Sequence, residues 1–197
     1  MLRMILGLYL SLLPVILAGS FNMKFCSSKY FESLNFPIDK GYSLNDGKRI
    51  LGKNKTYKGF LGMVVITSLL QVLLGWLSQL FQNLELLNVY YRVHDNLLFT
   101  NIWLGGLLGL AYVLFELPNS LLKRRFDTEP GMGAPEKYFW TFFLLDQIDS
   151  LIGIILVSRL ITNISRLEGM LILILGSITH IIVNLILYRL NWRQNPF

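Results

Sequence analysis

The most regular feature of the sequence is the alternation of long apolar stretches with shorter polar ones. Five stretches are rich in Leu, Ile, Val and Phe and contain almost no Lys or Arg; they cover residues 4–22, 59–81, 97–118, 139–158 and 170–188. About 20 apolar residues in a helix cross the hydrocarbon core of a bilayer. The pattern therefore predicts an all-α integral membrane protein with about five transmembrane helices.

No segment outside these stretches is long enough to form a soluble domain of its own, so we expect one membrane domain over residues 1–197. The first stretch also has features of a signal peptide, with Arg3 before it and small residues near Gly19. Cleavage there would leave the lysine-rich segment 23–58 outside the cell. We therefore expect the first stretch to be retained as a helix.

Composition supports a membrane protein and excludes other classes. Hydrophobic residues make up 53% of the chain and charged residues 15%, whereas soluble domains carry about 25% charged residues. This excludes a soluble globular domain and a disordered chain. The single cysteine, Cys26, excludes an internal disulfide and a cysteine-rich zinc site.

The charges are unevenly distributed along the chain, which has 18 Lys and Arg against 12 Asp and Glu. Fourteen of the 18 cations lie in residues 23–58, residues 119–138 and the tail after the last stretch. These segments fall on one side of a five-span chain. The positive-inside rule then places them in the cytoplasm, with the N-terminus outside and the C-terminus cytoplasmic.

Three carboxylates interrupt the apolar pattern: Glu116 near the end of the third stretch, and Asp146 and Asp149 in the fourth. Asp146 and Asp149 are three residues apart and share one helix face, where they repel each other unless a proton or a cation lies between them. Paired hard oxygen ligands suit Mg²⁺, which is the site we predict here. A proton or sodium relay that includes His180 is the alternative.

Two basic segments accompany these carboxylates. One follows Pro118 and contains Ser120, Lys123, Arg124 and Arg125. The other, residues 46–59, interleaves glycine, lysine and threonine just before a predicted helix. Alone, the first segment is typical of an anchor for anionic lipid headgroups, and the second is typical of a solvated basic loop. Beside an acidic metal site, cations and helix N-termini instead favour a phosphate pocket.

Three motifs in order along the chain resemble those of the CDP-archaeol synthase family. Residues 46–59 (DGKRILGKNKTYKG) resemble its D-G-x-R-[IL]-L-G-x-x-K-T-[WY]-[KR]-G loop. Residues 120–125 (SLLKRR) resemble its S-F-[LIV]-K-R-R segment, shared in shorter form with the phosphatidate cytidylyltransferases, and residues 146–149 (DQID) resemble its D-Q-[LI]-D pair. The resemblance extends over about residues 37–188.

The resemblance implies a nucleotidyltransferase that, with Mg²⁺, moves CMP from CTP to a lipid phosphate and releases pyrophosphate. It implies catalytic roles for Asp146, Asp149, Lys123 and Arg124. It implies nucleotide binding by Asp46, Gly47, Arg49, Lys55, Thr56, Lys58 and Gly59. It implies lipid-phosphate binding by Ser120, Lys123, Arg124 and Arg125, and metal binding by Asp146, Asp149 and Glu116.

The substrate implied by the resemblance is an archaeol-type 2,3-di-O-geranylgeranylglycerol phosphate or a related lipid, activated for phospholipid biosynthesis. We expect the site to face the cytoplasm from the cell membrane, with CTP, the lipid phosphate and membrane lipids as partners and no nucleic acid. We also allow for a homodimer.

One departure from the family pattern keeps other functions open: Glu116-Leu-Pro118 stands where archaeal members commonly have Gly-Asp. A carboxylate is kept here and a proline is added. A CDP-diacylglycerol synthase acting on phosphatidic acid is therefore the first alternative. A small ion-coupled transporter that uses Asp146, Asp149 and His180, and a structural protein whose basic loops only bind anionic lipid, are the others.

Overall fold

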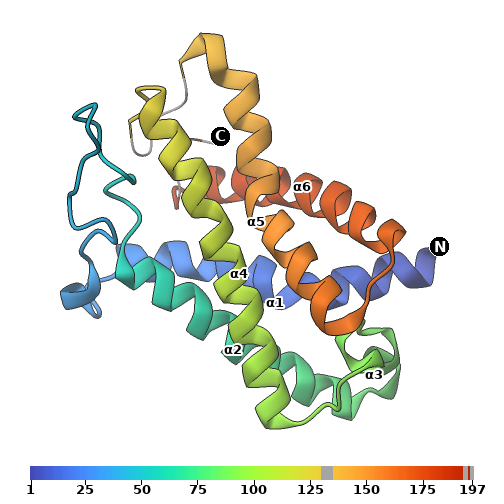
Figure 1. Ribbon diagram of the computed structural model, residues 1–197. Helices are drawn as coiled ribbons and strands as arrows, with labels where there is room; N and C mark the ends of the chain where they lie inside the picture. Colours follow the sequence, from blue (N-terminus) through green and yellow to red (C-terminus); the bar gives the residue numbers. More distant parts are fainter. Residues whose placement is uncertain (130–134, 193–194, 196–197) are drawn as a thin grey trace.

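The computed structural model describes residues 1–129, 135–192 and 195, and long helices dominate this part of the chain (Figure 1). The five long helices are α1 (Leu2–Ser27), α2 (Tyr57–Leu80), α4 (Leu98–Arg125), α5 (Phe139–Thr162) and α6 (Arg166–Arg189). The shorter elements are α3 (Gln82–Leu87) and three 3-10 turns at Glu32–Leu34, Tyr90–Arg92 and Glu136–Tyr138. The described residues contain no strand, only two isolated β-bridges.

All five long helices are long and apolar enough to cross a membrane, which confirms the predicted all-α membrane fold. α1 and α6 extend past the predicted apolar stretches at both ends, and α2, α4 and α5 extend past them at one end. The clearest case is α4, which continues through Pro118 to Arg125 instead of ending at the proline. A proline removes one backbone hydrogen bond and bends a helix, but packing on neighbouring helices can hold the helix together.

The centre of the bundle is α4, which packs between α2 and α5, while α1 and α6 lie next to each other behind them (Figure 1). Glycines permit the close approach of these helices. A Cβ atom added at Gly105 of α4 would lie 2.5 Å from Ser68 Cα, and one added at Gly153 of α5 would lie 2.6 Å from Ala111 O. Small residues bring transmembrane helices together in this way.

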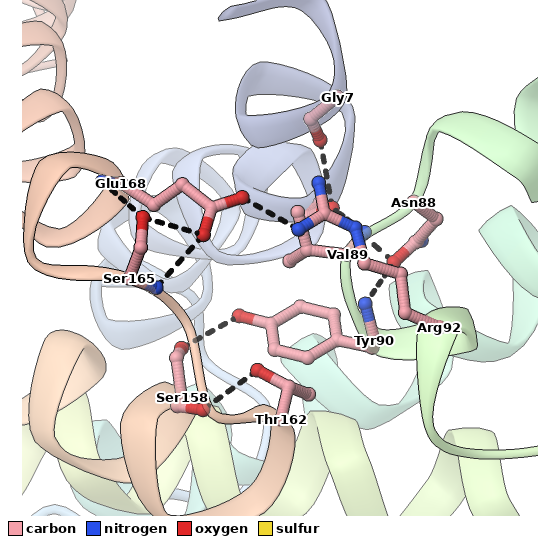
Figure 2. Close-up of polar contacts among 10 residues, drawn as sticks. Gly7, Asn88, Val89, Tyr90, Arg92, Ser158, Thr162, Ser165 and Glu168 are labelled. Carbon is pink, nitrogen blue, oxygen red and sulfur yellow. Dashed lines mark hydrogen bonds and ion pairs between the residues drawn. The ribbon is translucent and has the colours of Figure 1, made fainter. Parts of the chain in front are cut away.

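Polar contacts fasten the helix ends that lie opposite the loop between α1 and α2 (Figure 2). Here the segment between α3 and α4 reaches three helices. Ser11 Oγ of α1 donates to Asn88 Oδ1 at 3.2 Å. The hydroxyl groups of Tyr90 and Ser158 of α5 are 3.0 Å apart. These contacts, with the ion pair described next, hold one end of the bundle closed.

The same cluster includes the start of α6, where Ser165 is the N-cap and Glu168 completes a capping box. The Glu168 carboxylate accepts a hydrogen bond from Ser165 N at 2.8 Å and forms an ion pair with Arg92 at 2.5 Å. One carboxylate thus satisfies a free helix N–H and joins α6 to the segment before α4.

We expect Glu168→Gln to lower the stability of the protein by about 1 kcal/mol, because the uncharged amide weakens both the cap and the contact with Arg92. The apparent melting temperature in detergent measures this loss. Glu85→Gln is the matched control, since Glu85 forms no ion pair within the described residues. Equal melting temperatures for the two variants would contradict the prediction.

Candidate active site

A cavity of about 650 Å³ lies among α1, α2, α4, α5 and α6 and reaches the end of the loop that precedes α2. Its lining is mixed. Apolar side chains such as Val15, Met63 and Ile154 line it together with charged side chains from α4, α5 and the loop. The cavity can therefore accept a ligand that has both a charged group and an apolar part.

The charged part is organised by contacts between α4 and α5. Asn119 and Lys123 are four residues apart on α4, and Asp146 and Asp149 are three apart on α5, so each pair shares a helix face. Asn119 Nδ2 donates to Asp146 Oδ1 and to Asp149 Oδ2, both at 2.7 Å. Lys123 Nζ contacts Asp146 Oδ2 at 2.5 Å. One amide and one ammonium group thus hold two carboxylates together.

A second ion pair stands beside this network, between Lys55 at the end of the loop and Glu116 of α4. Lys55 Nζ and Glu116 Oε2 are 2.5 Å apart. Burial alone would lower the pKa of the Lys55 ammonium, but the charges of Glu116, Asp149 and Asp146 outweigh it and raise this pKa above its ordinary value. Lys55 is therefore a permanent cation at the cavity.

The loop that carries Lys55 is held in shape by a buried carboxylate, Asp39. Arg49 Nη2 donates to Asp39 Oδ1 at 2.5 Å, and the backbone N–H groups of Gly41 and Leu51 donate to the same carboxylate at 3.0 Å. Burial alone would raise the pKa of Asp39, but these hydrogen bonds and the Arg49 charge hold it below its ordinary value. The Asp39 carboxylate thus ties the two arms of the loop together.

Arg125 fastens the tip of the loop to the end of α4. The tip is a turn at Asp46 and Gly47, where Asp46 Oδ1 accepts from Lys48 N at 3.0 Å and Gly47 has a φ of +76°. The Arg125 guanidinium forms an ion pair with Asp46 and donates to the backbone oxygens of Lys48 and Arg49. This cation therefore binds the protein's own loop.

Lys58 has a comparable internal role at the start of α2. Its side chain is fully buried, and Nζ donates to Ser28 O at 2.7 Å, to Cys26 O at 3.3 Å and to Ser28 Oγ at 3.4 Å. The first two acceptors are backbone carbonyls at the end of α1, where the helix dipole favours a cation. Lys58 thus joins the end of α1 to the start of α2.

The structure brings most of the predicted site residues to the cavity. Those that line it are Lys55, Thr56, Gly59, Glu116, Ser120, Lys123, Arg124, Asp146 and Asp149. Those that do not line it are Asp46, Gly47, Arg49, Lys58 and Arg125. The first group includes Thr56, whose hydroxyl caps α2 by accepting from Gly59 N at 3.2 Å, and Ser120, whose hydroxyl accepts from Gly52 N at 3.2 Å.

Two residues that organise this site, Asn119 and Asp39, are not among the site residues predicted from the sequence. Asn119 lies three residues after Glu116 and four before Lys123, so its helical spacing could have indicated it once α4 was known to continue past Pro118. Asp39 gave no local signal, because its partner Arg49 lies on the other arm of the loop.

The donor atoms at the site are of the kind that bind Mg²⁺. Within the described residues, no three His, Cys, Asp or Glu side chains form a metal-binding group, so Glu116 is not gathered with Asp146 and Asp149. Asn119 turns its Nδ2 toward both carboxylates here, and its buried Oδ1 has no hydrogen-bond partner among the described residues, so a flip of this amide would present a third oxygen to the ion. Two carboxylates and an amide oxygen are hard ligands of the kind that Mg²⁺ takes.

Comparison with known families agrees with this geometry. A family profile described as CarS-like, CDP-archaeol synthase, matches residues 1–197. The chain is 34% identical over 168 residues to a CDP-archaeol synthase of Archaeoglobus fulgidus, covering 82% of this chain and 84% of that one. It is 30% identical over 161 residues to a CDP-archaeol synthase of Thermococcus gammatolerans, covering 82% of each chain.

The fold also resembles a solved structure described as an intramembrane enzyme for archaeal membrane lipids biosynthesis. The TM-score is 0.59 and the sequence identity is 24%, and the match covers 90% of this chain and 92% of the other. At this identity the match supports the arrangement of the helices.

The lowered pKa of Asp39 predicts that the loop loses its shape in acid. An Asp whose folded-state pKa lies below its unfolded value of about 3.9 stabilises the fold above that pH, and this contribution is lost as the pH falls through the folded pKa. We expect pepsin cleavage within residues 28–56 to increase over this range, measured against an unstructured substrate at each pH.

Two variants test the assignment to Asp39. Asp39→Asn, which lacks the titrating group, should be cleaved readily at every pH in the range. Glu32→Gln, an exposed position in the same loop, should behave like the unmodified protein. A pH profile of Asp39→Asn that matches the unmodified protein would show that another group controls the loop.

Proposed function

Because this chain belongs to the CDP-archaeol synthase family, we propose that it transfers CMP from CTP to a lipid phosphate and releases pyrophosphate. The observation that carries this proposal is the cavity in which cations from the loop and α4 meet the acidic pair of α5 between membrane-spanning helices. The cations match the phosphates of both substrates, and the apolar part of the lining matches lipid chains.

The reaction makes modest chemical demands on the protein. An oxygen of the lipid phosphate attacks the α-phosphorus of CTP, a new P–O bond forms, and the bond from that phosphorus to the β-phosphate oxygen breaks, so that pyrophosphate leaves. The attacking oxygen is already anionic, so no base is needed to remove a proton. The barrier arises from bringing two anions together in line, which positioning and positive charge lower.

We assign Mg²⁺ binding to Asp146, Asp149 and the oxygen of Asn119. When bound, the ion supplies positive charge to the phosphates of CTP and to the pyrophosphate that leaves. Glu116 instead holds Lys55 beside the cavity. Lys123 contacts Asp146 and is placed to neutralise phosphate charge next to this acidic pair.

The remaining cations divide into two groups by position. Lys55 and the N-terminus of α2 after Thr56 face the cavity and suit the triphosphate of CTP, since a helix N-terminus presents free N–H groups to anions. Ser120, Lys123 and Arg124 suit the lipid phosphate or the pyrophosphate. We assign positioning roles to the predicted residues outside the cavity: Asp46, Gly47, Arg49, Lys58 and Arg125.

The names of the relatives favour an archaeol-type lipid phosphate as the acceptor, and phosphatidic acid supports the same chemistry with ester-linked chains. We place the charged part of the cavity at the cytoplasmic face, where CTP is available and the lysine-rich loop lies. The N-terminus is then outside the cell.

We expect the purified protein to release pyrophosphate only when CTP, a lipid phosphate and Mg²⁺ are all present. Asp146→Asn and Asp149→Asn should each lower this rate by about 100-fold or more, because the metal loses a charged ligand. Pyrophosphate release with dialkylglycerol phosphate and with phosphatidic acid measures both the reaction and the preferred acceptor.

The control is Glu136→Gln, at an exposed position just before α5, which should keep full activity. Full activity of Asp149→Asn would remove the metal assignment. Ion flux through proteoliposomes without any dependence on nucleotide would replace the transferase with a transporter.

A second prediction separates two lysines that lie three residues apart. We expect Lys55→Met to raise the KM for CTP by about tenfold or more, because a cation facing the cavity is lost. Lys58→Met should lower the apparent melting temperature and leave the KM for CTP unchanged, because the Lys58 ammonium contacts the Cys26 carbonyl, Ser28 and the Phe25 ring, all at the end of α1 and outside the cavity's charged network. An equal rise in KM for Lys58→Met would place that lysine at the nucleotide.

A further inference from the structure

Asn184 of α6 is a buried polar side chain that the proposed reaction does not use. Only 3% of the residue is exposed, yet it lines the cavity and forms no hydrogen bond with any described residue. The other buried asparagines in the described part of the chain, at positions 88, 96, 101 and 119, each form at least one hydrogen bond. Asn184 therefore differs from every one of its counterparts.

The Asn184 amide is not among the fully buried unpaired groups of the described residues, so its polar atoms remain open to the cavity and available to a partner there. The other α6 residues that line the cavity include the apolar Val183 and Leu187 as well as Thr179 and His180, and no hydrogen bond joins any of them to Asn184 within the described residues. The amide faces a cavity large enough for a ligand. A ligand that offers hydrogen-bonding atoms at this point would satisfy it.

The position of Asn184 indicates which part of a ligand it meets. It lies five residues before Arg189, the last residue of α6, which is about 7–8 Å along the helix. α6 is also the least buried of the five spans, with 22% of its most apolar window inside the bundle against 33–39% for the others. The part of α6 around Asn184 therefore separates the cavity from the bilayer, a short way below the membrane surface.

We propose that the Asn184 amide binds the neutral oxygens that join the phosphate of the lipid acceptor to its two chains. The proposal rests on the proposed function and adds a residue that recognises the lipid backbone. An uncharged amide suits uncharged oxygens, whereas the phosphates have the cations of the loop and α4. Ether and ester lipids share this chemistry, because both place oxygens at this depth.

CTP is a less suitable partner for this amide. A nucleotide enters from water past the loop, where Lys55 and Thr56 face the cavity, while Asn184 lies on the helix with the greatest exposure to lipid. A hydrogen bond from Asn184 to the lipid backbone would set how deep the lipid lies. Its phosphate would then be held level with the network of Lys123 and Asp146.

The test combines a change in the protein with a change in the ligand. We compare the unmodified protein with Asn184→Leu, and a dialkylglycerol phosphate with a single-chain alkyl phosphate that lacks the linking oxygens. Binding is measured without CTP from the ligand-induced rise in apparent melting temperature, and the KM values for lipid and CTP are measured in the complete reaction.

We expect Asn184→Leu to bind dialkylglycerol phosphate about twofold to tenfold more weakly, which is the effect of losing a neutral hydrogen bond. The same variant should bind the alkyl phosphate as well as the unmodified protein does, and its KM for CTP should not change. Without ligand, the variant should be at least as stable as the unmodified protein, because it removes an unpaired polar group. Asn184→Gln, which keeps an amide, should recover part of the lost affinity.

Three results would overturn the inference. Equal losses of affinity for both lipids would show that Asn184 shapes the cavity wall without binding the linking oxygens. Leu187→Ala, a change to an apolar neighbour, provides the pattern expected for that case. A rise in the KM for CTP alone would assign the amide to the nucleotide. Unchanged binding of both lipids would leave Asn184 without a ligand. A failure of the proposed function is a separate result, in which the unmodified protein makes no pyrophosphate.

Discussion

The contact on which the site depends is the one between Asn119 and Lys123 of α4 and the two carboxylates of α5. Two aspartates a turn apart inside a membrane bundle repel each other and would be expelled from it unless donors compensated them. Asn119 donates to both at 2.7 Å and Lys123 contacts Asp146 at 2.5 Å. A buried pair of this kind contributes little net stability, so its presence here fits a functional role better than a structural one.

That contact exists because of the way the helices are packed. Gly105 brings α4 against α2, and Gly153 brings α5 against α4, at distances that no side chain would permit. At the opposite end of the bundle, the cluster of Tyr90, Arg92 and Glu168 holds the helix ends together. The helices are thus closed at one end, and the cavity lies toward the other, where the loop attaches.

Much of this could be predicted from residue patterns. The apolar windows predicted five membrane-crossing helices, because window length and bilayer thickness are directly related. The spacing of Asp146 and Asp149 predicted one shared face, because helical periodicity is local. The internal contacts of the Lys58 and Arg125 side chains could not be predicted. They depend on how the end of α1 and the tip of the loop approach these side chains in space. Asn119 was missed for a related reason, since Pro118 suggested a bend or an end where α4 continues.

The internal pairing of the cations has a consequence for how the protein meets charged molecules at long range. Lys48, Arg49, Lys55, Lys123 and Arg125 each contact a carboxylate within this end of the bundle. From more than a Debye length away, about 8 Å at physiological ionic strength, each such pair acts as a dipole and contributes little to the surface potential. The electrostatic attraction of nucleotides from solution is accordingly weaker than the 18 Lys and Arg side chains alone would suggest, and it follows the net charge of +6, which already includes the paired carboxylates. Ionic strength then affects the contacts made inside the cavity more than the rate at which a nucleotide arrives.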